Sequence, residues 1–418
     1  MKKNGFTLVE LLSIVVILGI IVVVALPQIS GSIGSKKEKQ YNKIVKIVEN
    51  AGKVYLIENV TKDSVSIDIL IKNDYLTSGL KNPINNTPLT GCVKKITSDG
   101  VTKYKYEVDN CPNYLTTYIM DLYDNEETRI ENGLKKDNTS DQNIRYYGSN
   151  PNNYVSFNNE LWRIIGVFGN NVKLIRSEKI GNLSWDSSES SINKGYGVNE
   201  WGESTYEDGS SYEGADLQVY LNKMYYGGDT TITCYGSANN GTKTCPTNKL
   251  DETSKSLIDN HTWNTGAIEF GKRTDTLAFY QAERGNQTGK ICSSGNNCND
   301  TVTRKTTWTG YVALPYVTDW AYASSESVCE TNMQKQDSSN AYICKNNNWM
   351  QRSRYTWYLS PNAYGSFASY AWFVSGDGYA IYDIAANSNA VAPSIYLKSN
   401  VLMKGGLGTS TDPYELSL

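Results

Sequence analysis

Histidine is almost absent from this chain of 418 residues, which contains only His261. A catalytic dyad or triad built on histidine would have to use that residue, and metal sites rich in histidine are excluded. Its polar neighbours at positions 259–262 favour a place in a loop or at a helix end over a catalytic role. We therefore expect no enzyme based on histidine, and no cofactor.

A surplus of positive charge is also missing. The 40 Lys and Arg residues are balanced by 43 Asp and Glu residues, which gives a formal net charge of −3. Without a basic stripe, the sequence offers no direct evidence for a nucleic-acid partner. Its 31 tyrosines and abundant asparagines instead favour a hydrated extracellular surface.

The CxxC spacing of zinc knuckles does not occur among the eight cysteines. The cysteines fall into four neighbouring pairs: Cys92 with Cys111, Cys234 with Cys245, Cys292 with Cys298, and Cys329 with Cys344. An even count in an exported chain predicts disulfides, although sequence alone leaves the connectivity open. Because each pair encloses many turn residues, bonds between neighbours are the simplest hypothesis.

One long apolar run, residues 11–26, follows a short head that contains Lys2 and Lys3. Glu10 at its edge would cost roughly 2 to 4 kcal/mol in a bilayer unless it is paired. Cleavage between Gly5 and Phe6 would create an α-amine about one helical turn away from Glu10, a suitable partner in a neighbouring copy. A secretory signal peptide would need small residues after the apolar run, and residues 22–27 offer no such site. As a plain membrane anchor, the apolar run would be near the lower length limit for spanning a bilayer, and this interpretation leaves Glu10 unexplained.

The run Gly5-Phe6-Thr7-Leu8-Val9-Glu10 resembles the N-terminal signature of type IV pilins and pseudopilins, and the resemblance extends over residues 1–58. It implies that prepilin peptidase cuts after Gly5 and methylates Phe6, and that Glu10 guides assembly with other pilin subunits. It also implies a platform protein and an ATPase as partners, and a helix kink at Pro27.

The resemblance divides the first part of the chain into a leader (1–5), a long helix (6–58, membrane-spanning over 6–26) and a small antiparallel β head (59–113). Basic residues in the leader place it on the cytoplasmic side, so the rest faces outward and then reaches the cell surface on a pilus. Six apolar residues continue the helical spacing: Tyr41, Ile44, Val45, Val48, Ala51 and Tyr55. Alternation on both sides of Asp99-Gly100 predicts a β-hairpin in the head.

The polar residues 114–143 predict a linker with at most a short helix, followed by a separate, β-rich mixed α+β domain over 144–418. Strand patterns at 154–157, 161–167 and 172–175 predict a β-meander, and 216–225 and 251–260 have short helical patterns. All nine tryptophans follow residue 160, which predicts an independent aromatic core. Trp185, Trp201 and Trp349 have polar neighbours and are the better candidates for exposure. Asp377, between two glycines, favours a β-turn over a calcium site.

The segments Leu161-Trp162-Arg163-Ile164-Ile165-Gly166 and Trp357-Tyr358-Leu359-Ser360-Pro361 resemble an uncharacterised domain of Gram-positive surface proteins. The closing strands are more distantly similar to the C-type-lectin-like and formylglycine-generating-enzyme superfamily. The leading hypothesis is a minor or tip pilin that displays an adhesive module for a host protein or glycan. A pseudopilin of a type II secretion or DNA-uptake system is the alternative. An enzyme is disfavoured, because formylglycine-generating catalysis needs reactive cysteines and each cysteine here has a close candidate partner.

Overall fold

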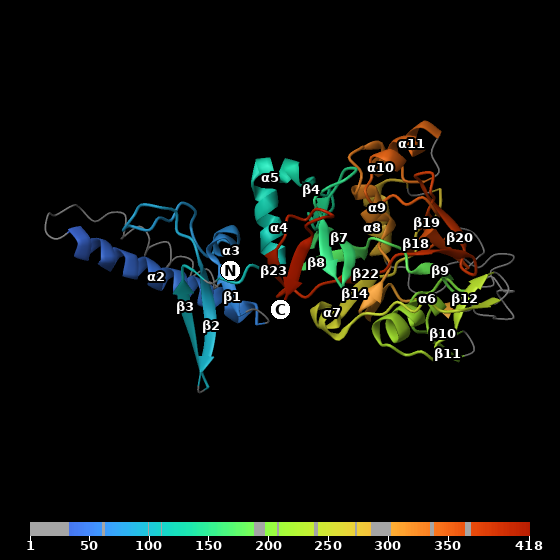
Figure 1. Cartoon of the computed structure of the whole chain (residues 1–418), viewed down its shortest axis with the longest axis horizontal. Coiled ribbons are helices and arrows are strands. Elements are labelled where there is room, and N and C mark those ends of the chain that lie inside the picture. Colours follow the sequence, from blue (N-terminus) through green and yellow to red (C-terminus); the bar gives the residue numbers. More distant parts are fainter. Residues whose placement is uncertain are drawn as a thin grey trace, which may run out of the picture. The chain divides into compact units, whose positions relative to one another are not determined.

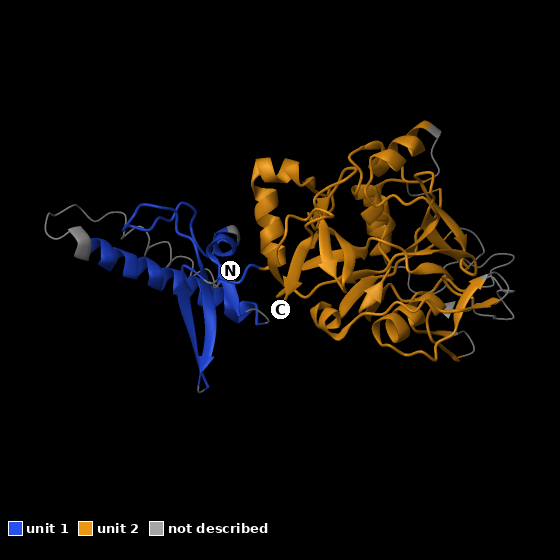
Figure 2. Ribbon diagram, viewed as in Figure 1, with its two compact units in different colours: residues 1–113 blue, residues 114–418 orange. Residues whose placement is uncertain are grey.

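The computed structural model describes residues 33–60, 63–98, 100–109, 111–187, 197–206, 209–237, 241–271, 274–285, 302–334, 338–363 and 369–418. The chain forms two compact units, residues 1–113 (unit 1) and 114–418 (unit 2) (Figure 2). Six residues for which the sequence predicts a role lie outside the described ranges: Gly5, Phe6, Glu10, Pro27, Cys292 and Cys298.

Unit 1 is built on helix α2 (Ile33–Glu58), which packs its apolar stripe on a small sheet (Figure 1). Ile44, Val48, Ala51 and Tyr55 are buried, as their spacing predicts. A Cβ at Gly52 would come within 2.4 Å of the Val93 side chain, so the glycine lets the helix approach the sheet closely. The helix ends at the residue that the sequence predicted.

The sheet of unit 1 has antiparallel strands in the order β1-β2-β3. Its elements are β1 (Ser64–Ser66), α3 (Ile67–Lys72), β2 (Cys92–Ser98) and β3 (Val101–Glu107). The β2–β3 register runs from Cys92 opposite Glu107 to Ser98 opposite Val101, which confirms the predicted hairpin. A disulfide joins Cys92 to Cys111 beyond the open end of the hairpin.

Unit 2 begins at Tyr114, and the expected linker over 114–143 is wrong. This stretch forms α4 (Leu115–Asp124), α5 (Glu126–Glu131) and β4 (Leu134–Lys136). Leu115 and Ile119 enter the core of unit 2, and the Asn125 side chain caps α5 by accepting from two backbone N–H groups. Tyr118, Met120, Leu122 and Tyr123 of α4 are partly buried and also pack against this core.

The largest sheet of unit 2 has the strand order β17-β22-β8-β7-β6-β24-β23, with β5 also paired to β7 and β4 to β5. Its further strands are β5 (Ile144–Tyr146), β6 (Tyr154–Phe157), β7 (Glu160–Phe168), β8 (Asn171–Arg176), β17 (Val312–Ala313), β22 (Ser394–Tyr396), β23 (Leu402–Gly405) and β24 (Tyr414–Ser417). The antiparallel β6-β7-β8 run confirms the predicted meander. Parallel pairing of β24 with β6 brings the last strand beside one of the first.

A second sheet has the order β20-β19-β18-β21-β9. Its strands are β9 (Gly181–Ser184), β18 (Thr356–Pro361), β19 (Tyr370–Val374), β20 (Ala380–Ile384) and β21 (Ser388–Val391). Smaller pairings join β10 (Ser204–Tyr206) to β11 (Ser211–Tyr212) and β15 (Val302–Thr303), β12 (Cys234–Ser237) to β13 (Gly241–Lys243), and β14 (His261–Asn264) to β16 (Thr307–Gly310). His261 therefore starts a strand, and not a loop or helix end.

The helices between these strands are short. They are α6 (Asp216–Val219), the π-helix η1 (Tyr220–Tyr226), α7 (Glu252–Leu257), α8 (Thr276–Glu283), α9 (Val317–Tyr322), α10 (Val328–Thr331) and α11 (Ser338–Asn346). Disulfides join Cys234 to Cys245 and Cys329 to Cys344, as expected for neighbouring cysteines.

Tryptophans dominate the core of unit 2, and the expected exposure of three of them is wrong. Trp185 and Trp201 are fully buried, with ring centroids 4.9 Å apart, and Trp349 is only 8% exposed. Trp185 also lies edge-on to Trp357, which is far along the chain. The prediction of exposure rested on polar neighbours in the sequence, whereas these rings are buried by segments that are distant in the sequence.

Candidate functional site

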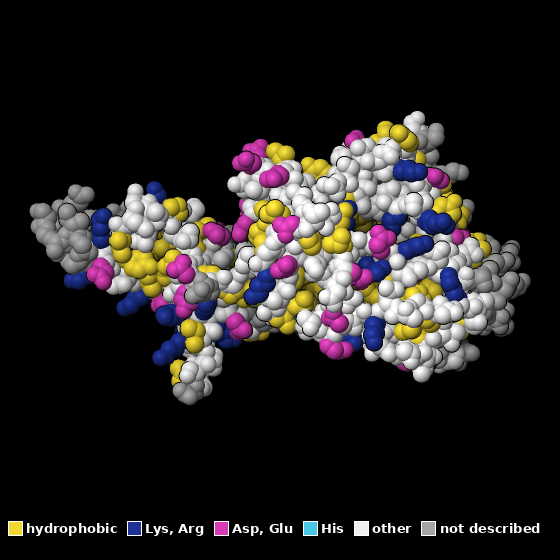
Figure 3. Space-filling model, in the orientation of Figure 1, with side chains coloured by type: hydrophobic (Ala, Val, Ile, Leu, Met, Phe, Trp, Pro, Cys, Tyr) yellow, Lys and Arg dark blue, Asp and Glu magenta, His cyan; other side chains and the backbone are white. Residues whose placement is uncertain are grey.

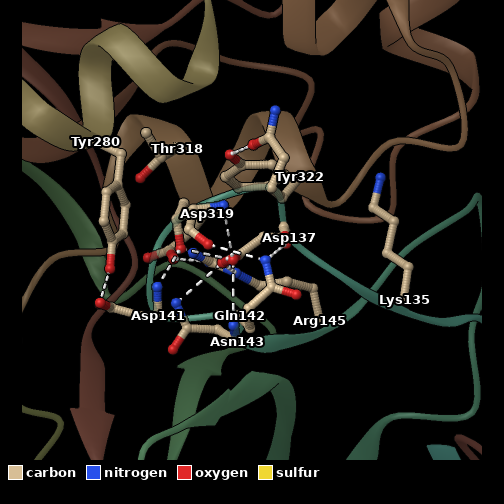
Figure 4. Close-up of polar contacts among 12 residues, drawn as sticks. Lys135, Asp137, Asp141, Gln142, Asn143, Arg145, Tyr280, Thr318, Asp319 and Tyr322 are labelled. Atoms are coloured by element: carbon tan, nitrogen blue, oxygen red, sulfur yellow. Dashed lines mark hydrogen bonds and ion pairs between the residues drawn. The ribbon is translucent and has the colours of Figure 1, made fainter.

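Four charged side chains meet in the interior of unit 2, and we call Asp137, Arg145, Lys173 and Asp319 the charge cluster. All four are at most 2% exposed. Arg145 bridges the two carboxylates, with Nε 2.9 Å from Asp137 Oδ2 and a terminal nitrogen 2.6 Å from Asp319 Oδ1 (Figure 4). Lys173 Nζ lies 2.6 Å from the other oxygen of Asp319. The cluster is therefore neutral overall.

The fold holds each member of the cluster from a different element. Arg145 comes from β5, Lys173 from β8, and Asp319 from the first turn of α9, where Oδ2 accepts the Tyr316 N–H at 2.8 Å. Asp137 directly follows β4 and accepts hydrogen bonds from Thr139 and Asn143. Asp137 Oδ2 accepts from both Asn143 and Arg145, and Asp319 Oδ2 accepts from both the Tyr316 N–H and Lys173.

Glu283, at the end of α8, is fully buried and accepts hydrogen bonds from the Thr318 hydroxyl at 2.9 and 3.1 Å. Burial raises the pKa of Glu283 to about 7, and the charge of Asp319 adds to this shift. Burial lowers the pKa of Lys173 to about 8, against the opposing effect of Asp319. Burial alone would raise the pKa of Asp319, but Lys173 and Arg145 outweigh it and hold that pKa below its usual value.

A hollow of about 500 Å³ on unit 2 concentrates basic residues, and we call it the basic depression. Its charged lining residues are Arg163, Lys179, Arg352, Arg354 and Glu178. On the face shown in Figure 3, acidic and basic side chains both occur among the polar residues. Four cations against one carboxylate make the depression locally positive.

Two arginines of the basic depression are held by backbone and aromatic groups. The Arg163 guanidinium lies 4.2 Å from the Tyr154 ring centroid and 4.5 Å from that of Trp349, and its Nε donates to Asn153 Oδ1 at 2.7 Å. Arg352 donates to the carbonyl oxygens of Arg176 and Ser177. Within the described ranges neither forms an ion pair.

Uncompensated positive charge in the basic depression has a measurable consequence. Burial lowers the pKa of Arg163 to about 10 and also lowers the pKa of Arg352. An anion bound beside them would offset this unfavourable burial, because guanidinium groups pair well with carboxylate, sulfate and phosphate. The arrangement is suited to binding an anion.

The other residues noted in the sequence have local roles. His261 Nδ1 lies 3.0 Å from Asp259 Oδ2, its ring stacks on Tyr396 at 3.7 Å, and burial lowers its pKa. Asp377 occupies the predicted turn, where the Gly378 N–H donates to the Ser375 carbonyl at 3.1 Å. Among the residues that the structure describes, no three His, Cys, Asp or Glu side chains gather as a metal site would require.

Sequence reasoning missed the charge cluster and the basic depression. The available signal was a single charge inside an apolar strand: Lys173 follows Val172 and precedes Leu174, and Arg163 stands between Trp162 and Ile164. Such residues are almost never buried without partners. The partner of Lys173 is Asp319, which lies 146 positions away, so spacing alone could not identify it.

Comparison with protein families matches residues 1–26 to the prokaryotic N-terminal methylation motif. Neither the curated proteins nor the solved structures gave a match. The chain therefore begins with the type IV pilin-like N-terminus of a prepilin peptidase substrate, and this supports membrane anchoring followed by surface display. No helix in the described part of the chain is both long and apolar enough to cross a membrane, and the segment predicted to do so, 6–26, lies outside that part.

Proposed function

We propose that this chain is a minor or tip subunit of a type IV pilus, cut between Gly5 and Phe6 by prepilin peptidase and methylated at Phe6. The match of residues 1–26 to the methylation motif carries the proposal. Unit 2 is much larger than unit 1 and would crowd a filament if every subunit carried it. A low copy number or a tip position avoids that crowding.

Assembly depends on Glu10. Its carboxylate pairs with the α-amine of Phe6 in a neighbouring subunit, which neutralises both charges where water is scarce. The apolar segment 11–26 packs against those of other pilins, and the platform protein and ATPase extrude the growing filament from the cytoplasmic membrane.

Substitutions at the motif test this function. Replacing Gly5 with a bulky residue, as in Gly5→Val, should leave full-length precursor in the membrane. Glu10→Ala should be cleaved normally, while its incorporation into surface filaments falls by about tenfold or more, as expected when a charge loses its partner in an apolar setting. Glu38→Ala removes an exposed carboxylate from α2 and is the matched control. Normal incorporation of Glu10→Ala would contradict the pairing role.

The basic depression is the surface of unit 2 that we propose for adhesion. Its four cations suit a host glycan or protein that carries carboxylate or sulfate groups. Arg354 is exposed at the rim, so Arg354→Gln should weaken binding of the full chain to immobilised heparin by a few-fold without unfolding it. Lys404→Gln, an equally exposed charge outside the depression, is the control. Equal losses for both variants would indicate non-specific attraction.

A pseudopilin of a secretion or DNA-uptake system shares the same N-terminal chemistry. Immuno-electron microscopy separates the two, because long surface fibres that carry this chain support a pilus. Their absence, with the chain cleaved and confined to the envelope, would support the pseudopilin.

A further inference from the structure

Lys173 and Asp319 bring an amine and a carboxylate together in a place that water does not reach. The two atoms, Nζ and Oδ2, are 2.6 Å apart, and both side chains are 0% exposed. The residues are separated by 146 positions in the sequence, and they come from β8 and α9. The amine is thus in direct contact with the carboxyl group, which is the arrangement from which a condensation would begin.

The surroundings of Lys173 are aromatic. Its Nζ lies 4.1 Å from the ring centroid of Tyr316, 5.1 Å from that of Trp263 and 5.2 Å from that of Tyr396. These rings exclude water, and their faces hold the Lys173 ammonium beside the carboxylate until it gives up its proton. The neutral amine that results is the nucleophilic form. The lowered pKa of Lys173 is consistent with this setting.

Two further donors contact the carboxylate oxygens of Asp319. Arg145 donates to Oδ1 at 2.6 Å, and the Tyr316 N–H donates to Oδ2 at 2.8 Å. Two such donors stabilise negative charge that develops on the carboxyl oxygens when a nucleophile adds to Cγ. Glu283 is fully buried, and its carboxyl accepts from the hydroxyl of Thr318, the residue before Asp319 in α9, at 2.9 Å. This hydrogen bond holds the Glu283 carboxyl at the same turn of α9 as Asp319.

We propose that Lys173 and Asp319 become joined by an intramolecular amide bond, with Glu283 as the proton relay. The Lys173 Nζ–Asp319 Cγ bond forms, and one Cγ–O bond of Asp319 breaks. One proton passes directly from Nζ to the departing oxygen, Oδ2, across their 2.6 Å contact. Glu283 takes a second proton from the nitrogen and delivers it to the same oxygen, which leaves as water. The ammonium and carboxylate together supply all the atoms of the amide and the water, so no other reactant is needed and Glu283 ends unchanged.

Charge balance in the interior supports this reaction. Before it, two cations and two carboxylates make up the charge cluster; after it, Arg145 and Asp137 remain as a single neutral pair 2.9 Å apart. The amide thus removes two buried charges without leaving any charge unpaired, whereas loss of either residue alone would leave one. A covalent link between β8 and α9 would tie the central sheet to a distant helix, which suits a subunit exposed to pulling forces.

Mass spectrometry of the full chain tests the bond directly. After complete reduction of disulfides, the wild-type protein should be lighter by one water than its processed sequence. Proteolysis should give one branched peptide that contains both Lys173 and Asp319. An intact mass without this deficit, or a water loss located elsewhere such as in a cyclised aspartate, would overturn the proposal.

Matched variants test the relay. Glu283→Gln should lose the branched peptide while its tryptophan fluorescence remains native, and Glu330→Gln should keep it. Lys135 and Glu330 form an internal control, because their ion pair is as short, at 2.5 Å, but both side chains are 24% exposed. A branched peptide in folded Glu283→Gln would overturn the role of Glu283. If that variant does not fold, the wild-type mass still decides whether the bond exists.

Discussion

The two units of this chain bury different kinds of side chain. Among the described residues of unit 1, Ser64 is the one buried polar side chain, and the ion pair Lys94–Glu107 lies at the surface with both partners about a quarter exposed. Unit 2 surrounds the charge cluster with a tryptophan-rich core. Unit 1 is stabilised by a pattern of apolar residues, whereas unit 2 also depends on specific pairings between distant elements.

The sharpest way to test this contrast is to break a charge pair in each unit. Asp319→Ala leaves Lys173 without a carboxylate partner in the interior, while Arg145 keeps Asp137, and we expect it to lower the unfolding free energy of unit 2 by about 3 to 5 kcal/mol. Tryptophan fluorescence during urea unfolding reports this change selectively, because all nine tryptophans lie in unit 2.

Glu107→Ala is the counterpart in unit 1. Its carboxylate is screened by water, so hydrogen exchange in the β2–β3 hairpin should change little. A large loss of stability in unit 1 from Glu107→Ala, or a small loss in unit 2 from Asp319→Ala, would contradict the view that only unit 2 depends on buried charge pairs.

Next in size is the loss of a disulfide. Cys111→Ser removes the disulfide to Cys92, which lies 19 positions away in the sequence. The loss should destabilise unit 1 by about 3 kcal/mol, because the unfolded chain gains conformational entropy without the cross-link. Cys344→Ser removes the 15-residue link to Cys329 and should act on unit 2 alone. Hydrogen exchange of the hairpin and tryptophan fluorescence separate the two responses; a shift of both units by either variant would show that they unfold together.

Unit 1 was largely predictable because its signals are local. The apolar stripe of α2 repeats every three to four residues, and Asp99-Gly100 marks a turn between alternating strands. The meander of unit 2 follows the same rule. The linker prediction failed at α4, where Leu115 and Ile119 are buried and four further apolar side chains pack against the core, because this short helix lies between polar stretches.

The candidate sites of unit 2 were not predictable, because their residues meet only through the fold. Lys173 finds Asp319 across 146 positions, and Arg163 in β7 meets Trp349 from near the other end of the unit. A charged residue inside an apolar strand indicates that a partner of opposite charge or a polar partner exists. It does not say which residue the partner is.

The buried acid of unit 2 predicts a pH dependence of its stability. Glu283 ionises at its ordinary pKa of 4.5 in the unfolded chain but keeps its proton to about 7 when folded. Between these values the folded state binds more protons, so stability of unit 2 should fall as the pH rises from 4.5 to about 7.

Glu283→Gln should flatten that slope when urea midpoints are compared across this range by tryptophan fluorescence. Glu330→Gln, which removes a partly exposed carboxylate, should leave the slope unchanged. An unaltered slope in Glu283→Gln would assign the proton uptake to another group.

The smallest expected effect should be equal in the two units. Gly100 in the hairpin turn of unit 1 and Gly209 in unit 2 have φ angles of +75° and +84°, and a Cβ at either would meet no atom within 4 Å. Alanine at each position should therefore cost only the backbone strain, about 1 kcal/mol. Hydrogen exchange near each turn measures the change. Equal losses of stability would indicate that the two units differ in their cores and not in their turns. A much larger loss at Gly209 would indicate that their loops differ as well.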